Sequence, residues 1–154
     1  MDDDMYETIL IPYDGSDEGD MGARHGIELA AALGATVHVL YVIDLPGAPR
    51  ALSIRDDEEQ MRKEYNDYAD RILDEMGEVA ADYGVDAVGV RRSGSPSEEI
   101  VEYAEEEGID AIVMGTGFRG KIGTLLGGTA DKVVRTATVP VLTKRKNVED
   151  IPSR

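Results

Sequence analysis

The chain is 154 residues long, a length that suits one compact domain and is short for two. Its 32 acidic residues outnumber its 16 basic ones, and the formal net charge of −16 excludes a surface built to bind nucleic acid or anionic membranes, because both need clustered cations. Because the chain has no cysteine, disulfides and thiolate metal sites are excluded, and a cytoplasmic location is the simplest interpretation.

Long apolar segments are also missing from the sequence. No run approaches the roughly 18 apolar residues of a membrane span, and the acidic start Met1–Asp4 lacks the apolar stretch of a secretory signal. The acids are spread over the whole chain. This distribution favours a surface kept solvated by carboxylates, as in proteins from a high-salt cytoplasm, over one acidic binding patch. The alternative is an ordinary acidic protein. Since salt screens like-charge repulsion, we expect the melting temperature to rise with salt, and a flat response up to molar salt would contradict this.

The first elements are read from short apolar runs and turn residues. A β-branched run at 8–11, closed by the turn residues Pro12–Ser16, predicts a buried strand. A helix is predicted over 17–33, because Gly34 is suited to the left-handed conformation that commonly ends a helix. The run 36–43 predicts a second strand.

The longest amphipathic pattern lies between 56 and 83 and predicts a helix that follows a loop at 44–55. The acids at 56–59 complement the positive end of its dipole. Apolar residues recur at three- and four-residue spacing, and we interpret them as core rather than as a cofactor-binding box. These residues are Met61, Tyr65, Tyr68, Ala69, Ile72, Met76, Val79, Ala80 and Tyr83.

The second half of the chain continues the alternation. A strand is predicted at 87–91 and a helix from Ser95 to about Gly108, where Ser95 and Glu98 have capping-box spacing and Pro96 takes the favoured first helical position. The remaining predictions are a strand at 110–114, a short helix at 130–137 and a last strand at 139–143.

Strand and helix thus alternate four times before a final strand, a pattern that demands parallel pairing. We predict a three-layer α/β sandwich with a five-stranded parallel sheet, formed by a single domain over 1–154 with its core at about 5–145 and a tail at 146–154. Pro140 within the last strand favours a sheet edge. That edge, with Val139, Val141 and Thr143, predicts a homodimer.

Two unusual segments follow the first and fourth predicted strands. One is Pro12–Ser16, and the other is Gly115–Thr129, which holds six glycines. Ligands of open α/β sheets bind beyond the carboxyl ends of the strands. Glycines allow close backbone approach, and the amide groups at a helix start hold anions. Together with Arg119 and Lys121, this segment predicts an anionic ligand, whereas the alternative is a surface loop whose cations balance nearby acids.

Three landmarks, taken together, resemble the universal stress protein family. They are Pro12–Ser16, the strand end Tyr41–Asp44, and Val113–Thr116 followed by Gly128-Thr129, a helix and Val139–Leu142. The resemblance covers about 5–145 and implies a Rossmann-like fold of the adenine nucleotide alpha hydrolase type with strand order 3-2-1-4-5. It also implies ATP or AMP as the ligand, with or without magnesium, in a dimeric stress-response module.

The glycine motif departs from that of ATP-binding family members at one position. Those members carry two glycines separated by two residues, then nine residues, then Gly followed by Ser or Thr. Gly115, Gly128 and Thr129 fit this spacing, but Phe118 replaces the second glycine. Gly117 and Gly120 flank the gap, and a shifted loop is one way to restore the site.

By resemblance, backbone groups near Val42 meet the adenine, and Asp14 and Gly115 lie near the ribose. The phosphates face Gly128, Thr129 and Ala130. For Asp14 and Thr129, a role as helix caps is the alternative. The complete set of predicted site residues is Pro12, Tyr13, Asp14, Val42, Met114, Gly115, Gly117, Arg119, Gly120, Gly128, Thr129 and Ala130.

Other chemistries find less support in the sequence. A phosphoacceptor domain needs an acid after the third strand, where this chain has Arg91 and Arg92, and the isolated His25 and His38 favour packing or surface roles over metal binding. We identify no nucleophile and base, and expect no enzyme activity beyond weak incidental ATP hydrolysis. Three functions stay open: a nucleotide-binding dimeric regulator, a dimeric interaction protein without nucleotide and with unknown protein partners, and an ATP-using enzyme.

Overall fold

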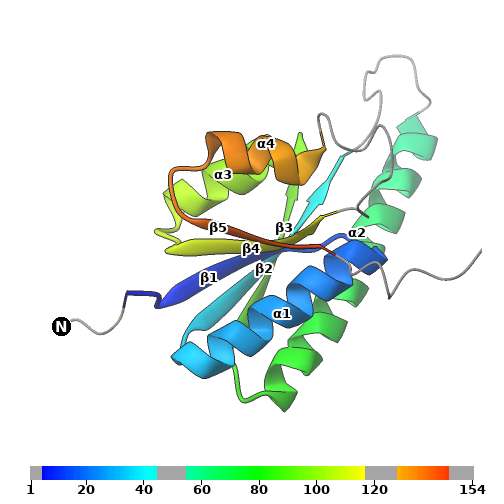
Figure 1. Ribbon diagram of the computed structural model, residues 1–154. Coiled ribbons are helices and arrows are strands. Elements are labelled where there is room, and N and C mark those ends of the chain that lie inside the picture. Colours follow the sequence, from blue (N-terminus) through cyan, green and yellow to red (C-terminus); the bar gives the residue numbers. More distant parts are fainter. Residues whose placement is uncertain (1–4, 45–54, 117–127, 146–154) are drawn as a thin grey trace, which may run out of the picture.

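The computed structural model describes residues 5–44, 55–116 and 128–145 and is shown in Figure 1. Strands and helices alternate along these residues, as the sequence predicts. The elements are β1 Thr8–Pro12, α1 Asp17–Leu33, β2 Thr36–Ile43, α2 Arg55–Asp82, β3 Ala87–Ser93, α3 Pro96–Glu106, β4 Ala111–Thr116, α4 Thr129–Thr136 and β5 Val141–Arg145.

The strands form one parallel sheet in the order β3-β2-β1-β4-β5. Helices α1 and α2 lie on one face of this sheet, and α3 and α4 lie on the other (Figure 1). The predicted three-layer α/β fold and its strand order are therefore confirmed. Because the chain reverses its winding direction between β1 and β4, a crevice is expected at the carboxyl ends of these two strands.

The sheet separates two hydrophobic cores. Consecutive residues of β1 alternate between them, so that Ile9 and Ile11 pack under α1 and α2, whereas Leu10 packs under α3 and α4. All three side chains are fully buried. A strand covered on both faces carries an unbroken apolar run, which explains the sequence pattern at 8–11.

Helix α1 approaches the sheet very closely. A Cβ atom on Gly22 would overlap the backbone of Gly115 at the end of β4, and a Cβ on Gly115 would overlap the carbonyl of Glu18. Gly26 likewise leaves room for the side chain of Ile11. These glycines bring the start of α1 and the end of β4 together at the crevice.

Three local predictions need correction. The last strand begins at Val141 rather than at 139, because Pro140 lacks an amide hydrogen; its carbonyl oxygen accepts a hydrogen bond from the Ile112 amide (2.9 Å). Ser95 does precede α3, but its side chain makes no capping hydrogen bond. In the α2 stripe Met61 is 47% exposed, and Tyr83 at the far end is 45% exposed, so neither is core.

Candidate functional site

A cleft of about 980 Å³ lies at the carboxyl ends of β1 and β4. It is open to solvent and receives residues from strands β1, β2, β4 and β5 and from all four helices. Every predicted site residue that the structure describes lines it, whereas Gly117, Arg119 and Gly120 lie outside the described residues. The lining residues predicted from sequence are Pro12, Tyr13, Asp14, Val42, Met114, Gly115, Gly128, Thr129 and Ala130.

The loop between β1 and α1 is held by a small hydrogen-bond network. Oδ1 of Asp14 accepts from the Ser16 amide (2.9 Å) and from the Ser16 hydroxyl (2.6 Å). The Ser16 Oγ in turn accepts from the Gly19 amide (3.0 Å), so Ser16 is the N-cap of α1. The alternative interpretation of Asp14 as the cap of α1 is therefore wrong. Asp14 instead holds Ser16, the residue that caps this helix.

The opposite wall contains the start of α4. Gly128 is the N-cap of this helix, so the alternative reading of Thr129 as its N-cap is wrong by one residue. The cleft is lined at this point by Gly128, Thr129, Ala130 and Asp131. The first amide groups of an α-helix have no acceptor within the helix and point away from its start, which makes this wall suited to an anion.

Charge in the cleft is mainly negative among the residues that the structure describes. Asp14, Glu18, Asp44 and Asp131 line it, and Arg145 is the one described lining residue with a positive side chain. An anionic ligand therefore needs further compensation, either from a bound cation or from the Arg119–Lys121 segment outside the described residues.

Tyrosines form the wall on the α2 side. The cleft is lined by Tyr13, which follows β1 directly, by Tyr41 of β2 and by Tyr65 of α2. Burial raises the pKa of Tyr13 to about 12, with smaller contributions from nearby acids, first Asp20. The sequence pattern predicts Tyr65 in the core and gives Tyr41 no site role, because helix and strand periodicity identify the inward face without showing where the core ends.

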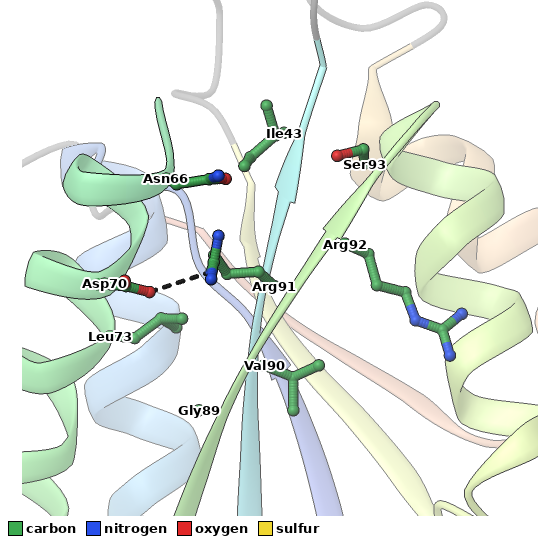
Figure 2. A pocket seen from close by; sticks show the side chains of 9 residues that line it. All are labelled: Ile43, Asn66, Asp70, Leu73, Gly89, Val90, Arg91, Arg92 and Ser93. Atoms are coloured by element: carbon green, nitrogen blue, oxygen red, sulfur yellow. Dashed lines mark ion pairs between the residues drawn. The ribbon is translucent and has the colours of Figure 1, made fainter. Parts of the chain in front are cut away.

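A second hollow, of about 600 Å³, lies between α2 and the edge strand β3 (Figure 2). Arg91 points toward α2 and pairs with Asp70 (Nε to Oδ1, 3.0 Å). Arg92 points to the opposite face, where it pairs with Glu106 (2.5 Å) and Glu99 (3.5 Å) of α3. Both arginines lie within β3, which extends two residues beyond the predicted end at 91, and the residues that end and follow this strand, Ser93 and Gly94, are not acidic.

The two histidines serve no metal site within the described ranges. The ring Nδ1 of His38 lies 2.6 Å from the hydroxyl of Tyr103, so this histidine links β2 to α3. The described residues 5–44, 55–116 and 128–145 contain no group of three or more His, Asp or Glu able to hold a metal ion. In the same ranges, no helix has the length and apolar character needed to cross a membrane.

A parallel sheet of this order, with a cleft at its winding reversal, defines the Rossmann-like α/β class. The model of the Universal stress protein family matches residues 5–145. A universal stress protein of Methanocaldococcus jannaschii is 35% identical over 148 residues, covering 94% of this chain and 85% of the relative. The chain therefore belongs to the universal stress protein family.

Solved structures share the fold. The structure of hypothetical protein MJ0577 matches with a TM-score of 0.75 and 28% identity, covering 93% of this chain and 98% of that one. A universal stress protein in complex with cAMP matches at 0.68 with 24% identity, covering 92% and 98%. The universal stress protein from Archaeoglobus fulgidus in complex with dAMP matches at 0.61 with 24% identity, covering 90% and 98%.

Proposed function

We propose that this chain binds an adenine nucleotide, ATP or AMP, in the cleft at the ends of β1 and β4, and acts as a dimeric regulatory module in the stress response. The observation that carries the proposal is the convergence of three sequence landmarks, Pro12–Asp14, Val42 and Gly128–Ala130, on one cleft. Family members in complex with cAMP and dAMP add support, because both ligands are adenine nucleotides.

Each wall of the cleft has a part in this proposal. The phosphate lies at the start of α4, where Gly128 and Ala130 offer backbone amides and Thr129 adds a hydroxyl. The ribose lies near Asp14, whose position the Ser16 contacts fix. A bound triphosphate would bring further negative charge to a cleft that already holds four carboxylates. A magnesium ion would compensate this charge, since Mg²⁺ is commonly held by one or two carboxylates together with substrate phosphates.

The proposal assigns no catalytic role to the cleft. Its described lining holds carboxylates and hydroxyls but no histidine, cysteine or lysine, and the hydrogen bond from the Ser16 hydroxyl to Asp14 belongs to the cap of α1. Any hydrolysis of bound ATP is expected to be slow and incidental.

Dimerisation is proposed through the outer edge of β5, the last strand of the sheet. Leu142 is 44% exposed there, and Val134 of the neighbouring α4 is 52% exposed. Because the Pro140 carbonyl bonds to β4, the alternation of the strand directs the backbone amides of Val141 and Thr143 to the open edge. Thr143→Pro removes one outward donor, so sedimentation equilibrium is expected to show a dimer for the parent chain and a monomer for this variant.

Calorimetric titration with AMP and MgATP in molar potassium chloride tests the nucleotide proposal. We expect saturable binding that Gly128→Val and Thr129→Val weaken at least tenfold, because a bulky side chain covers the amides and the hydroxyl is lost. Gly128 has φ −69°, which valine adopts without strain. Thr136→Val, at the other end of α4, is the matched control; equal binding by all variants would contradict the phosphate assignment.

A dimeric interaction protein without nucleotide is the second candidate function. Phe118, which replaces a glycine of the ATP-binding motif, and the excess of acids in the described cleft favour it. If this candidate holds, the parent chain binds no nucleotide, whereas Phe118→Gly gains binding in the same titration. Equal affinity of the parent chain and Phe118→Gly would remove the argument from Phe118.

A further inference from the structure

Helix α2 is much longer than the sheet that it covers. Its 28 residues extend over about 42 Å, whereas the eight residues of β2 extend over about 26 Å. The middle and end of α2 bury Ala69, Ile72 and Met76 in the core. The preceding turns of the helix reach toward the cleft, which Tyr65 lines.

Tyr65 continues the apolar stripe of α2 beyond the core. It lies three and four residues before Tyr68 and Ala69, on the same helix face. Tyr68 packs against the core, but Tyr65 is half-buried and lines the cleft. Core packing explains the stripe from Tyr68 to Ala80, so it gives Tyr65 no structural reason to be aromatic.

The neighbouring rings are held in place from behind. Tyr41 and Tyr68 meet edge to face, with ring centroids 5.9 Å apart and an interplanar angle of 69°. The guanidinium of Arg71 lies 5.0 Å above the Tyr68 ring. The Tyr68 hydroxyl occupies the space where a side chain on Gly15 would project, which ties α2 to the loop that carries Asp14. Tyr41, which the contact with Tyr68 holds in place, lines the cleft together with Tyr65.

We propose that Tyr65, which lines the cleft together with Tyr41, forms the wall on which the aromatic base of the nucleotide stacks. The inference rests on the proposed nucleotide function and adds a residue that determines affinity for the base. An aromatic base stacked on a protein ring gains affinity through its flat face, whatever its exocyclic groups. The carboxylate of Asp44 lines the same cleft and suits a base that carries an exocyclic amino group, as adenine does.

Substitution at Tyr65 separates stacking from other effects. Tyr65→Leu keeps an apolar side chain and is expected to weaken AMP binding about tenfold, whereas Tyr65→Phe keeps the ring and should bind AMP as the parent chain does. Ribose 5-phosphate, which lacks the base, should bind the parent chain and Tyr65→Leu equally. Tyr83→Leu is the matched control, because Tyr83 follows α2 at its other end and hydrogen-bonds Glu28.

Fluorescence gives a direct reading of contact. The chain has no tryptophan, so Tyr65→Trp introduces a single indole whose emission a stacked base quenches. We expect saturable quenching by AMP and none by ribose 5-phosphate, and no quenching of Tyr83→Trp by either. If AMP binds the parent chain but Tyr65→Leu binds equally and Tyr65→Trp is not quenched, the stacking wall is overturned and the nucleotide function stands. If the parent chain binds no AMP, the proposed function fails first and the wall fails with it.

Discussion

Helices α1 and α2 cover the same face of the sheet by opposite means. Helix α1 turns glycines toward the strands, so that its backbone meets the end of β4 at Gly22 and Gly115. Helix α2 uses large side chains, among them Ile72 and Met76, and its Gly77 faces open space. The close helix brings two loops together at the cleft, and the more distant helix supplies an aromatic wall beside them.

The largest expected effect breaks the close approach of α1. Gly22→Ala should lower the free energy of unfolding by about 3 kcal/mol, because its methyl group meets backbone atoms of Gly115 that have little freedom to move. Urea denaturation in molar potassium chloride measures the change. A loss below about 0.5 kcal/mol, the range of neutral surface changes, would show that the two backbones are not in close contact.

The next effect lies where both helices meet β1. The folded-state pKa of Tyr13 is raised to about 12 from 10.0, chiefly by burial and then by Asp20 of α1 and Glu75 of α2. The neutral phenol is favoured in the folded chain, so its contribution to stability is complete below pH 10 and is lost as the pH rises to 12. Over that window the parent chain should lose on the order of 2 kcal/mol more than Tyr13→Phe; parallel stability profiles would contradict the assignment.

Gly77→Ala should act in the opposite direction to Gly22→Ala. Apart from the adjacent residues and the backbone of α2 itself, no atom lies within 4 Å of a Cβ at this position, and alanine favours a helix interior over glycine. We expect a gain of up to about 1 kcal/mol in the same denaturation experiment. A loss of stability would mean that α2 packs as closely at this point as α1 does.

The smallest effect is expected at the edge of the α2 layer. The ion pair between Asp70 and Arg91 is exposed, with 56% and 40% of the side chains accessible. Surface pairs of this kind contribute little, so Asp70→Asn should change the free energy of unfolding by less than about 0.5 kcal/mol. A loss above about 1 kcal/mol would show that this pair, rather than apolar contact, holds α2 to β3.

Local signals in the sequence predict most of the fold. Helix α1 and strand β2 have the predicted bounds, and Gly34 takes the left-handed conformation (φ 72°) that ends α1. The cleft was also predictable, because its position follows from strand order. The sequence predicts the start of β5 two residues too early, with Pro140 inside the strand, whereas Pro140 precedes it.

Contacts between residues far apart in the sequence cannot be predicted from local sequence patterns. Gly115 was expected near a ligand, yet its contact with Glu18 gives glycine a packing reason as well. Nothing near Gly22 in the sequence identifies its partner, 93 residues away. Tyr65 fits the stripe of a core helix, and its place in the cleft depends on where the sheet ends beneath α2.

A crystal structure of the chain grown with AMP in molar potassium chloride tests the central claim most directly. The account predicts AMP in the cleft, with its phosphate at the amides of Gly128–Ala130, its ribose near Asp14 and its base against Tyr65. AMP bound in the hollow between α2 and β3, or an empty cleft at saturating AMP, would contradict it.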